Sequence, residues 1–130
     1  MALRAGPSPM RLLVVEDDDD LRETLVVMLE LRGHRVEAAA DGETALELAA
    51  GTQPDAALVD LGLPDITGHE VARRLRADPG CRRMLLIALT GFSAETERAA
   101  AREAGFDAFL VKPVAVEELD RALGGRSGRL

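Results

Sequence analysis

Polar side chains follow four of the short apolar runs in this sequence, at the points where those runs end. Glu16 and Asp17 follow the first run, and the others are followed by Asp60, Thr90 and Lys112. If the runs are parallel strands, their carboxyl ends meet at one edge, where open α/β sheets bind ligands. Carboxylates, a hydroxyl and an ammonium group would converge there. Packing does not require such a cluster, so we interpret it as a site for chemistry.

The carboxylates in this cluster indicate a metal ion. Like charges about 4 Å apart repel by roughly 4 kcal/mol at an effective dielectric constant near 20, so Glu16, Asp17 and Asp60 need protonation or a bound cation. Oxygen ligands in an open site favour Mg²⁺, with Mn²⁺ as a substitute. A calcium-binding EF-hand loop does not fit, because Arg22 stands at its glycine position and Met28 at its glutamate position.

The same cluster has the groups that phosphoryl transfer requires. Beside a metal ion, Asp60 can act as a nucleophile toward a phosphoryl donor, while Lys112 and the Thr90 hydroxyl neutralise charge on the transferring oxygens. The product would be an aspartyl phosphate. Lys112 is the one lysine among the 16 basic residues, which indicates a need for a compact ammonium group instead of a planar guanidinium.

The apolar runs themselves predict the strands that position these groups. They lack polar alternation, as strands covered on both faces do. The pattern predicts central strands at 12–15, 56–59, 85–89 and 108–111. A further segment at 34–38 alternates apolar and polar residues, which favours a place at the sheet edge.

Segments with helical periodicity alternate with the predicted strands. Their apolar positions are Leu21, Leu25, Met28 and Leu29; Ala45, Leu46 and Ala49; Val71, Ala72 and Leu75; Ala99, Ala100 and Ala104; and Leu119, Ala122 and Leu123. Asp20, Thr67 and Ser93 are predicted to cap helix starts, and Gly33 and Gly105 to follow helix ends. Strand and helix alternate five times, which predicts a doubly wound α/β fold with a parallel sheet and five helices.

Composition limits the class of protein. The 130 residues suit one domain, which we place at 10–124, with an N-terminal arm at 1–9 and a C-terminal tail or linker end at 125–130. A net charge of -7 argues against nucleic-acid binding by this chain. The apolar runs are too short to span a bilayer and no signal peptide is recognisable, so we expect a cytoplasmic protein without membrane contact.

The cysteine and the two histidines of the sequence have no predicted chemical role. Cys81 lies in a loop-like stretch and has no cysteine to pair with, so we interpret it as a surface thiol. His34 and His69 have no carboxylate or cysteine at metal-ligand spacing, which favours a surface or structural role.

Four separated motifs resemble those of response-regulator receiver domains of two-component signalling systems. They occur in the family's order, at the predicted strand ends, within residues 11–123. The motifs are Val14 to Asp17, Leu58 to Pro64, Ala88 to Thr90 and Val111 to Pro113. The resemblance, close to that with chemotaxis regulators, implies a flavodoxin-like, five-stranded sheet in the order 2-1-3-4-5.

The resemblance also implies a role for each site residue. Asp60 would take its phosphoryl group from the phosphohistidine of a histidine kinase or histidine phosphotransfer protein. Asp17 and Asp60 would bind Mg²⁺, Glu16 would act mostly through water, and the Gly62 carbonyl would complete the protein ligands. Lys112 would contact the phosphate.

A conformational switch is a further implication of the resemblance. Thr90 would move to hydrogen-bond a phosphoryl oxygen and Phe109 would swing inward, changing the face formed by the fourth helix, fifth strand and fifth helix. The Lys112–Pro113 peptide would be cis. We also hypothesise that Phe92, two residues after Thr90, covers the phosphoryl group and slows autodephosphorylation.

Other functions fit the sequence less well. An aspartate-nucleophile phosphatase usually carries a second aspartate two residues after the nucleophile, where this chain has Gly62, so we expect a signalling switch and not an enzyme. A flavin carrier is opposed by the absence of Trp and Tyr. Whether the chain is a stand-alone regulator or a receiver cut from a hybrid histidine kinase stays open, as does a phosphorylation-dependent homodimer.

Overall fold

The computed structural model describes residues 8–92 and 94–124. Most of the arm predicted at 1–9 and all of the tail predicted at 125–130 lie outside the described residues. Strands and helices alternate along the chain. They are β1 (Arg11–Val15), α1 (Asp19–Leu31), β2 (Arg35–Ala39), α2 (Gly42–Thr52), β3 (Ala56–Asp60), α3 (Gly68–Ala77), β4 (Leu85–Thr90), α4 (Glu95–Ala104), β5 (Ala108–Val111) and α5 (Val116–Gly124).

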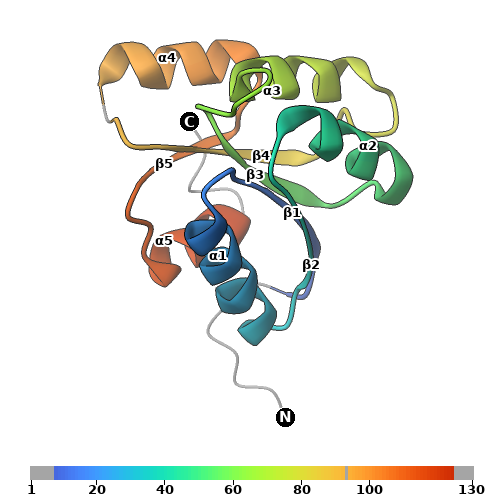
Figure 1. The fold of residues 1–130 in the computed structure, drawn as a ribbon, viewed down its shortest axis with the longest axis vertical. Coiled ribbons are helices and arrows are strands. Elements are labelled where there is room, and N and C mark those ends of the chain that lie inside the picture. The colour runs from blue at the N-terminus through green and yellow to red at the C-terminus, as the bar shows by residue number, and fades with distance from the viewer. Residues whose placement is uncertain (1–7, 93, 125–130) are drawn as a thin grey trace.

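The strands form one parallel sheet in the order β2-β1-β3-β4-β5 (Figure 1). This order confirms the predicted doubly wound fold, and β2 lies at an edge as expected. Every residue of β3 and β4 is buried, because helices cover both faces of the sheet. Their residues are apolar except for Asp60 and Thr90, which end the two strands. None of the helices in residues 8–92 and 94–124 is long and apolar enough to cross a membrane.

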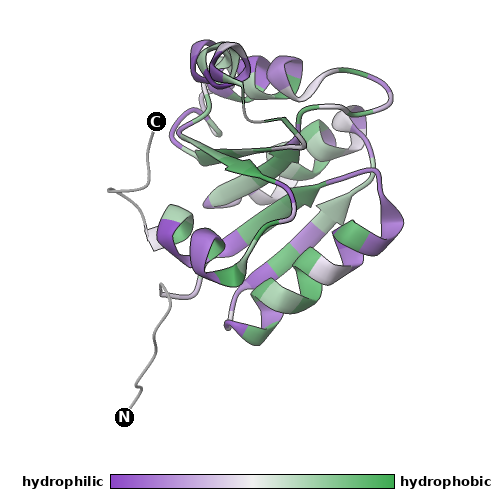
Figure 2. Cartoon of the chain, turned by 90° about the vertical axis from the view of Figure 1, so that its left-hand side faces the viewer, coloured by the Kyte–Doolittle hydropathy of each residue, from purple (hydrophilic) through white to green (hydrophobic). Residues whose placement is uncertain are grey.

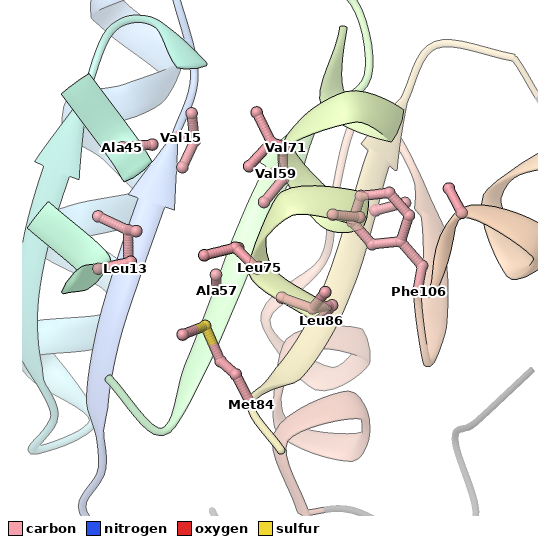
Figure 3. Packing of buried hydrophobic residues seen from close by; sticks show 14 of the residues in the cluster. Leu13, Val15, Ala45, Ala57, Val59, Val71, Leu75, Met84, Leu86 and Phe106 are labelled. Carbon is pink, nitrogen blue, oxygen red and sulfur yellow. The ribbon is translucent and has the colours of Figure 1, made fainter. Parts of the chain in front are cut away.

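The core has two layers, one on each face of the sheet. Helices α1 and α5 pack on one face and α2, α3 and α4 on the other (Figure 1). Successive strand residues point to opposite faces, so Leu12 and Val14 pack against α1 and α5, whereas Leu13 and Val15 belong to the other layer (Figure 3). In Figure 2 the hydrophobic colour is concentrated on the strands and the purple on outward helix faces.

Helix caps follow the predictions in part. Thr67 caps α3 by accepting the backbone N–H of Glu70, and Gly105 ends α4 in the left-handed region with a φ of 116°, as predicted. The predicted cap Asp20 is wrong, because Asp18 accepts the N–H of Leu21 and Asp20 lies in the first turn of α1. The other predicted helix-end glycine, Gly33, has a φ of 95°. The predicted cap Ser93 lies outside the described residues.

The burial of Cys81 and of one residue in α4 differs from the sequence-based expectation. Cys81 is only 2% exposed and its thiol lies 3.7 Å from the carbonyl oxygen of Ala49, so the predicted surface thiol is wrong. In α4 the buried residues are Ala101 and Ala104, whereas Ala100, predicted to be apolar-facing, is exposed. The alanine-rich stretch contains no large residue to indicate which face packs, so several registers satisfy the same periodicity.

The loop between β3 and α3 is attached to the start of α2 by Asp65. Its carboxylate accepts the backbone N–H groups of Gly42 and Glu43, each at 2.9 Å. Helix N-termini leave such N–H groups without partners and favour negative charge. These hydrogen bonds lower the pKa of Asp65 from 3.8 to about 2. The loop that follows Asp60 is therefore attached to a second helix.

We predict that Asp65 makes part of the stability depend on acidic pH. Because its pKa is lower in the folded state, its contribution is complete above about pH 4 and is lost as the pH falls toward 2. The free energy of unfolding of Asp65→Asn should therefore fall less than that of the wild type between about pH 4.5 and pH 2.5. Urea unfolding followed by circular dichroism measures this difference.

A matched control for this experiment is Glu37→Gln on the exposed edge strand β2, since the Glu37 side chain forms no hydrogen bond within the described residues. The control should keep the acid dependence of the wild type. Equal acid dependence in Asp65→Asn and the wild type would contradict the prediction.

Candidate functional site

The predicted site residues meet at the carboxyl edge of the sheet. Parallel pairing places Val15 of β1 beside Val59 of β3, so Glu16, the next residue, lies next to Asp60. On the other side of β3, Asp60 pairs with Leu89, the residue before Thr90. The strand register thus brings together side chains that are far apart in the sequence.

The three carboxylates form a compact group with both buried and open members. One oxygen from each of Glu16, Asp17 and Asp60 lies within 4.8 Å of the others. Glu16 is 1% and Asp60 7% exposed, whereas Asp17 is exposed to solvent. Such a group of hard oxygen donors, open on one side, suits a cation that keeps part of its water shell, as Mg²⁺ does.

Lys112 is the cation of this cluster. Its Nζ atom lies 2.8 Å from Oε1 of Glu16 and 3.4 Å from Oδ1 of Asp60. The second oxygen of Glu16, Oε2, accepts the backbone N–H of Asp18 at 3.1 Å. The peptide between Lys112 and Pro113 is cis, as expected. One ammonium group therefore contacts two carboxylates from neighbouring strands.

Burial and charge shift the pKa values of two groups in the cluster. Burial raises the pKa of Glu16, and the charge of Asp60 adds to this effect, although hydrogen bonds from Lys112 and Asp18 oppose it. Burial alone would lower the pKa of Lys112, but its contacts with Glu16 and Asp60 outweigh burial and the pKa is raised. The cluster has three carboxyl groups and one ammonium group, and a divalent cation would balance excess negative charge among them.

Thr90 and Phe92 lie on the β4 side of the cluster. Thr90 ends β4 and is 5% exposed. Its Oγ1 accepts the backbone N–H of Phe92 at 3.1 Å. The Phe92 ring is 70% exposed. This bond uses an acceptor lone pair of the Thr90 oxygen, so the hydroxyl proton can still be donated to another acceptor.

Phe109 is buried and contacts an arginine that the sequence reasoning did not identify. The ring is 6% exposed, and the guanidinium carbon of Arg98 in α4 lies 4.6 Å from its centroid. A cation over an aromatic ring at this distance is attracted by roughly 1 kcal/mol. No local motif joins Arg98 to Phe109, because the contact depends on how α4 packs beside β5.

Two glycines lie beside Asp60. The N–H of Gly62 donates to Oδ1 of Asp60 at 3.1 Å, and a Cβ at Gly62 would meet no atom within 4 Å. The start of α3 is much tighter, since a Cβ at Gly68 would lie 2.5 Å from the carbonyl oxygen of Asp60. Gly68 thus lets α3 begin directly against the end of β3. The sequence reasoning gave Gly68 no role. The one signal for it was its position just after the predicted cap Thr67.

Known proteins share this arrangement. A family model described as the response regulator receiver domain matches residues 12–124. The chain belongs to this family. Receiver domains are signalling switches of two-component systems, bind Mg²⁺ at an acidic site and interact with histidine kinases or phosphotransfer proteins. The receiver domain described here has that acidic site at Glu16, Asp17 and Asp60.

Among curated proteins, this receiver domain is similar to response regulators named MprA. The protein from Mycolicibacterium vanbaalenii is 42% identical over 111 residues, which cover 85% of this chain and 47% of the relative. A regulator of the same name from Mycobacterium leprae is also 42% identical, over 110 residues. The chain therefore spans about half the length of the curated relatives it matches.

Solved receiver structures have the same fold. The chemotaxis protein CheY4 of Vibrio cholerae superposes with a TM-score of 0.84 at 28% identity, over 89% of this chain and 97% of that one. The receiver domain of the sensor histidine kinase PA1611 from Pseudomonas aeruginosa gives 0.82 at 34% identity, over 89% and 95%. That structure has a magnesium ion coordinated in its active-site cleft.

Proposed function

We propose that Asp60 accepts a phosphoryl group from the phosphohistidine of a histidine kinase or phosphotransfer protein, assisted by Mg²⁺. The observation that carries this proposal is the position of Asp60, at the end of a buried strand and 3.4 Å from the ammonium group of Lys112. An oxygen of Asp60 forms the new bond to phosphorus as the phosphorus–nitrogen bond of the donor breaks, and the donor imidazole takes up a proton. Lys112 and Thr90 stabilise the charge on the phosphoryl oxygens.

The residues of the acidic cluster, together with Gly62, bind the metal ion in this proposal. Asp17, Asp60 and the Gly62 carbonyl hold Mg²⁺, with Glu16 acting mostly through water. The metal supplies positive charge next to the transferring phosphoryl group, and Mn²⁺ can replace it. The chain assists its own phosphorylation and slow dephosphorylation. It acts as a switch with no turnover of a separate substrate.

The output of the switch is the surface formed by α4, β5 and α5. Thr90 moves to donate its hydroxyl to a phosphoryl oxygen, and Phe109 fills the space that Thr90 leaves. The Phe109 ring is already buried under Arg98, which favours the inward position. A phosphorylation-dependent homodimer through this surface is part of the proposal.

Two settings for the switch have support from relatives. The similarity to MprA favours a regulator, and the similarity to the PA1611 receiver favours a receiver from a sensor kinase. In either setting we assign the receiver to 10–124, the arm to 1–9 and the tail or linker end to 125–130. The net charge of -7 argues against nucleic-acid binding by this domain. We further propose that the domain is cytoplasmic and does not contact a membrane.

We predict that Asp17→Asn weakens Mg²⁺ binding about tenfold or more, because it removes a charged oxygen ligand. Asp20→Asn is the matched control, since Asp20 is exposed in the first turn of α1 and forms no hydrogen bond within the described residues. Isothermal titration calorimetry gives both affinities. If the two variants bind Mg²⁺ equally well, the metal is held elsewhere.

We predict that acetyl phosphate and Mg²⁺ add one phosphoryl group to the wild type and none to Asp60→Asn. Intact-mass spectrometry detects the adduct. Mn²⁺ should support the reaction and a chelator should prevent it. An adduct on Asp60→Asn, or no adduct on a folded wild type that binds Mg²⁺, would contradict the proposal.

We predict that Phe92→Ala shortens the lifetime of the phosphorylated protein several-fold, because the small side chain leaves the phosphoryl group open to water. Loss of the mass adduct over time, after acetyl phosphate has been removed, measures the lifetime. Phe92→Leu keeps an apolar cover and should retain most of the wild-type lifetime. An unchanged lifetime in Phe92→Ala would show that the ring does not protect the phosphoryl group.

A further inference from the structure

A second charged site lies at the amino edge of the sheet, opposite the acidic cluster. A hollow of about 500 Å³ lies at the start of β4, at Leu85, and beside Phe106 and Asp107, which precede β5. Arginines from three segments line it: Arg76 of α3, Arg82 and Arg83 of the loop before β4, and Arg102 of α4. None of these residues belongs to the proposed phosphorylation site.

Arg76 is fully used in holding the walls of the hollow together. Its guanidinium donates to the carbonyl oxygens of Arg82, Met84 and Gly105, and pairs with the Asp107 carboxylate at 2.8 Å. Asp107 also accepts the backbone N–H of Leu86. Asp107 is the only carboxylate that lines the hollow within the described residues. The Arg76 guanidinium and the Asp107 carboxylate thus already have partners.

The other three arginines have no such partners. Arg82, Arg83 and Arg102 are exposed. Across residues 8–92 and 94–124 their guanidinium groups form no hydrogen bond or ion pair, although the carbonyl oxygen of Arg82 accepts from Arg76. Three unpaired guanidinium groups thus surround one hollow in a chain whose net charge is -7.

Helix dipoles do not account for this concentration of charge. Helices α3 and α4 end near the hollow, at Ala77 and Ala104, and the carboxyl end of a helix carries roughly half a negative charge. Two such ends offset about one of the three positive charges. The remaining positive charge favours the approach of anions to the hollow.

We propose that this arginine hollow, lined by Arg82, Arg83 and Arg102, binds a small oligophosphate, such as the triphosphate group of a nucleotide. The planar guanidinium fork matches phosphate oxygens in pairs, which makes arginine the side chain best suited to recognising phosphate. The volume lies in the range of small-molecule sites. A compact anion with several negative charges balances the three guanidinium groups.

Titration of the full chain with inorganic tripolyphosphate, without divalent metal ions, tests this proposal by calorimetry. The wild type should bind one equivalent. The double variant Arg82→Gln/Arg83→Gln should lose affinity about tenfold or more, because charge-assisted hydrogen bonds are removed. The matched control is Arg121→Gln, an exposed arginine of α5 outside the hollow, and it should bind nearly as tightly as the wild type.

Two further measurements make the outcome decisive. Asp60→Asn should bind tripolyphosphate like the wild type, which separates this site from the proposed phosphorylation site. A hexaglutamate peptide should bind more weakly than tripolyphosphate. The proposal is overturned if the wild type shows no saturable binding, if the double variant binds like Arg121→Gln, or if hexaglutamate binds more tightly. Thermal unfolding of each variant verifies that it is folded.

Discussion

The contact of Lys112 with Glu16 and Asp60 is the interaction on which the acidic site depends. The two carboxylates are almost fully buried at the ends of neighbouring strands, where unpaired charges would be costly. One ammonium group contacts both and leaves the exposed carboxylate of Asp17 without an equivalent partner. The site therefore combines a fixed positive charge with an excess of carboxyl groups, an arrangement that suits a divalent cation.

The parallel sheet places the acidic cluster and the arginine hollow at opposite ends of its strands. Every strand begins at one edge and ends at the other, so residues before and after the strands gather on opposite sides of the domain. The acidic cluster lies at the carboxyl edge and the arginine hollow at the amino edge. Strand β4 joins them directly, since it begins at Leu85 beside the hollow and ends at Thr90 beside Asp60. Helix α4 contacts β5 through Arg98 over Phe109 and lines the hollow through Arg102.

Local sequence rules succeed here where one local interaction decides the outcome. Thr67 caps α3 as predicted because its hydroxyl needs only an N–H three residues ahead. The rule is ambiguous in the run of four aspartates before α1, since each has the same capping chemistry. Asp18 forms the cap because its backbone is extended there and its carboxylate accepts the N–H of Leu21. That conformation is a property of the packed fold.

The sequence by itself determined the doubly wound fold class, the buried strands and the members of the acidic cluster, because unbroken apolar runs mark buried strands and parallel strands end at one edge. The strand order was implied by the family resemblance. Contacts between distant elements were decided only by the tertiary structure. Arg98 contacts Phe109, Asp65 accepts N–H groups at the start of α2, and Cys81 is buried against Ala49. These contacts depend on the distance and rotation between packed helices. Periodicity shows which face of a helix is apolar but not what that face meets.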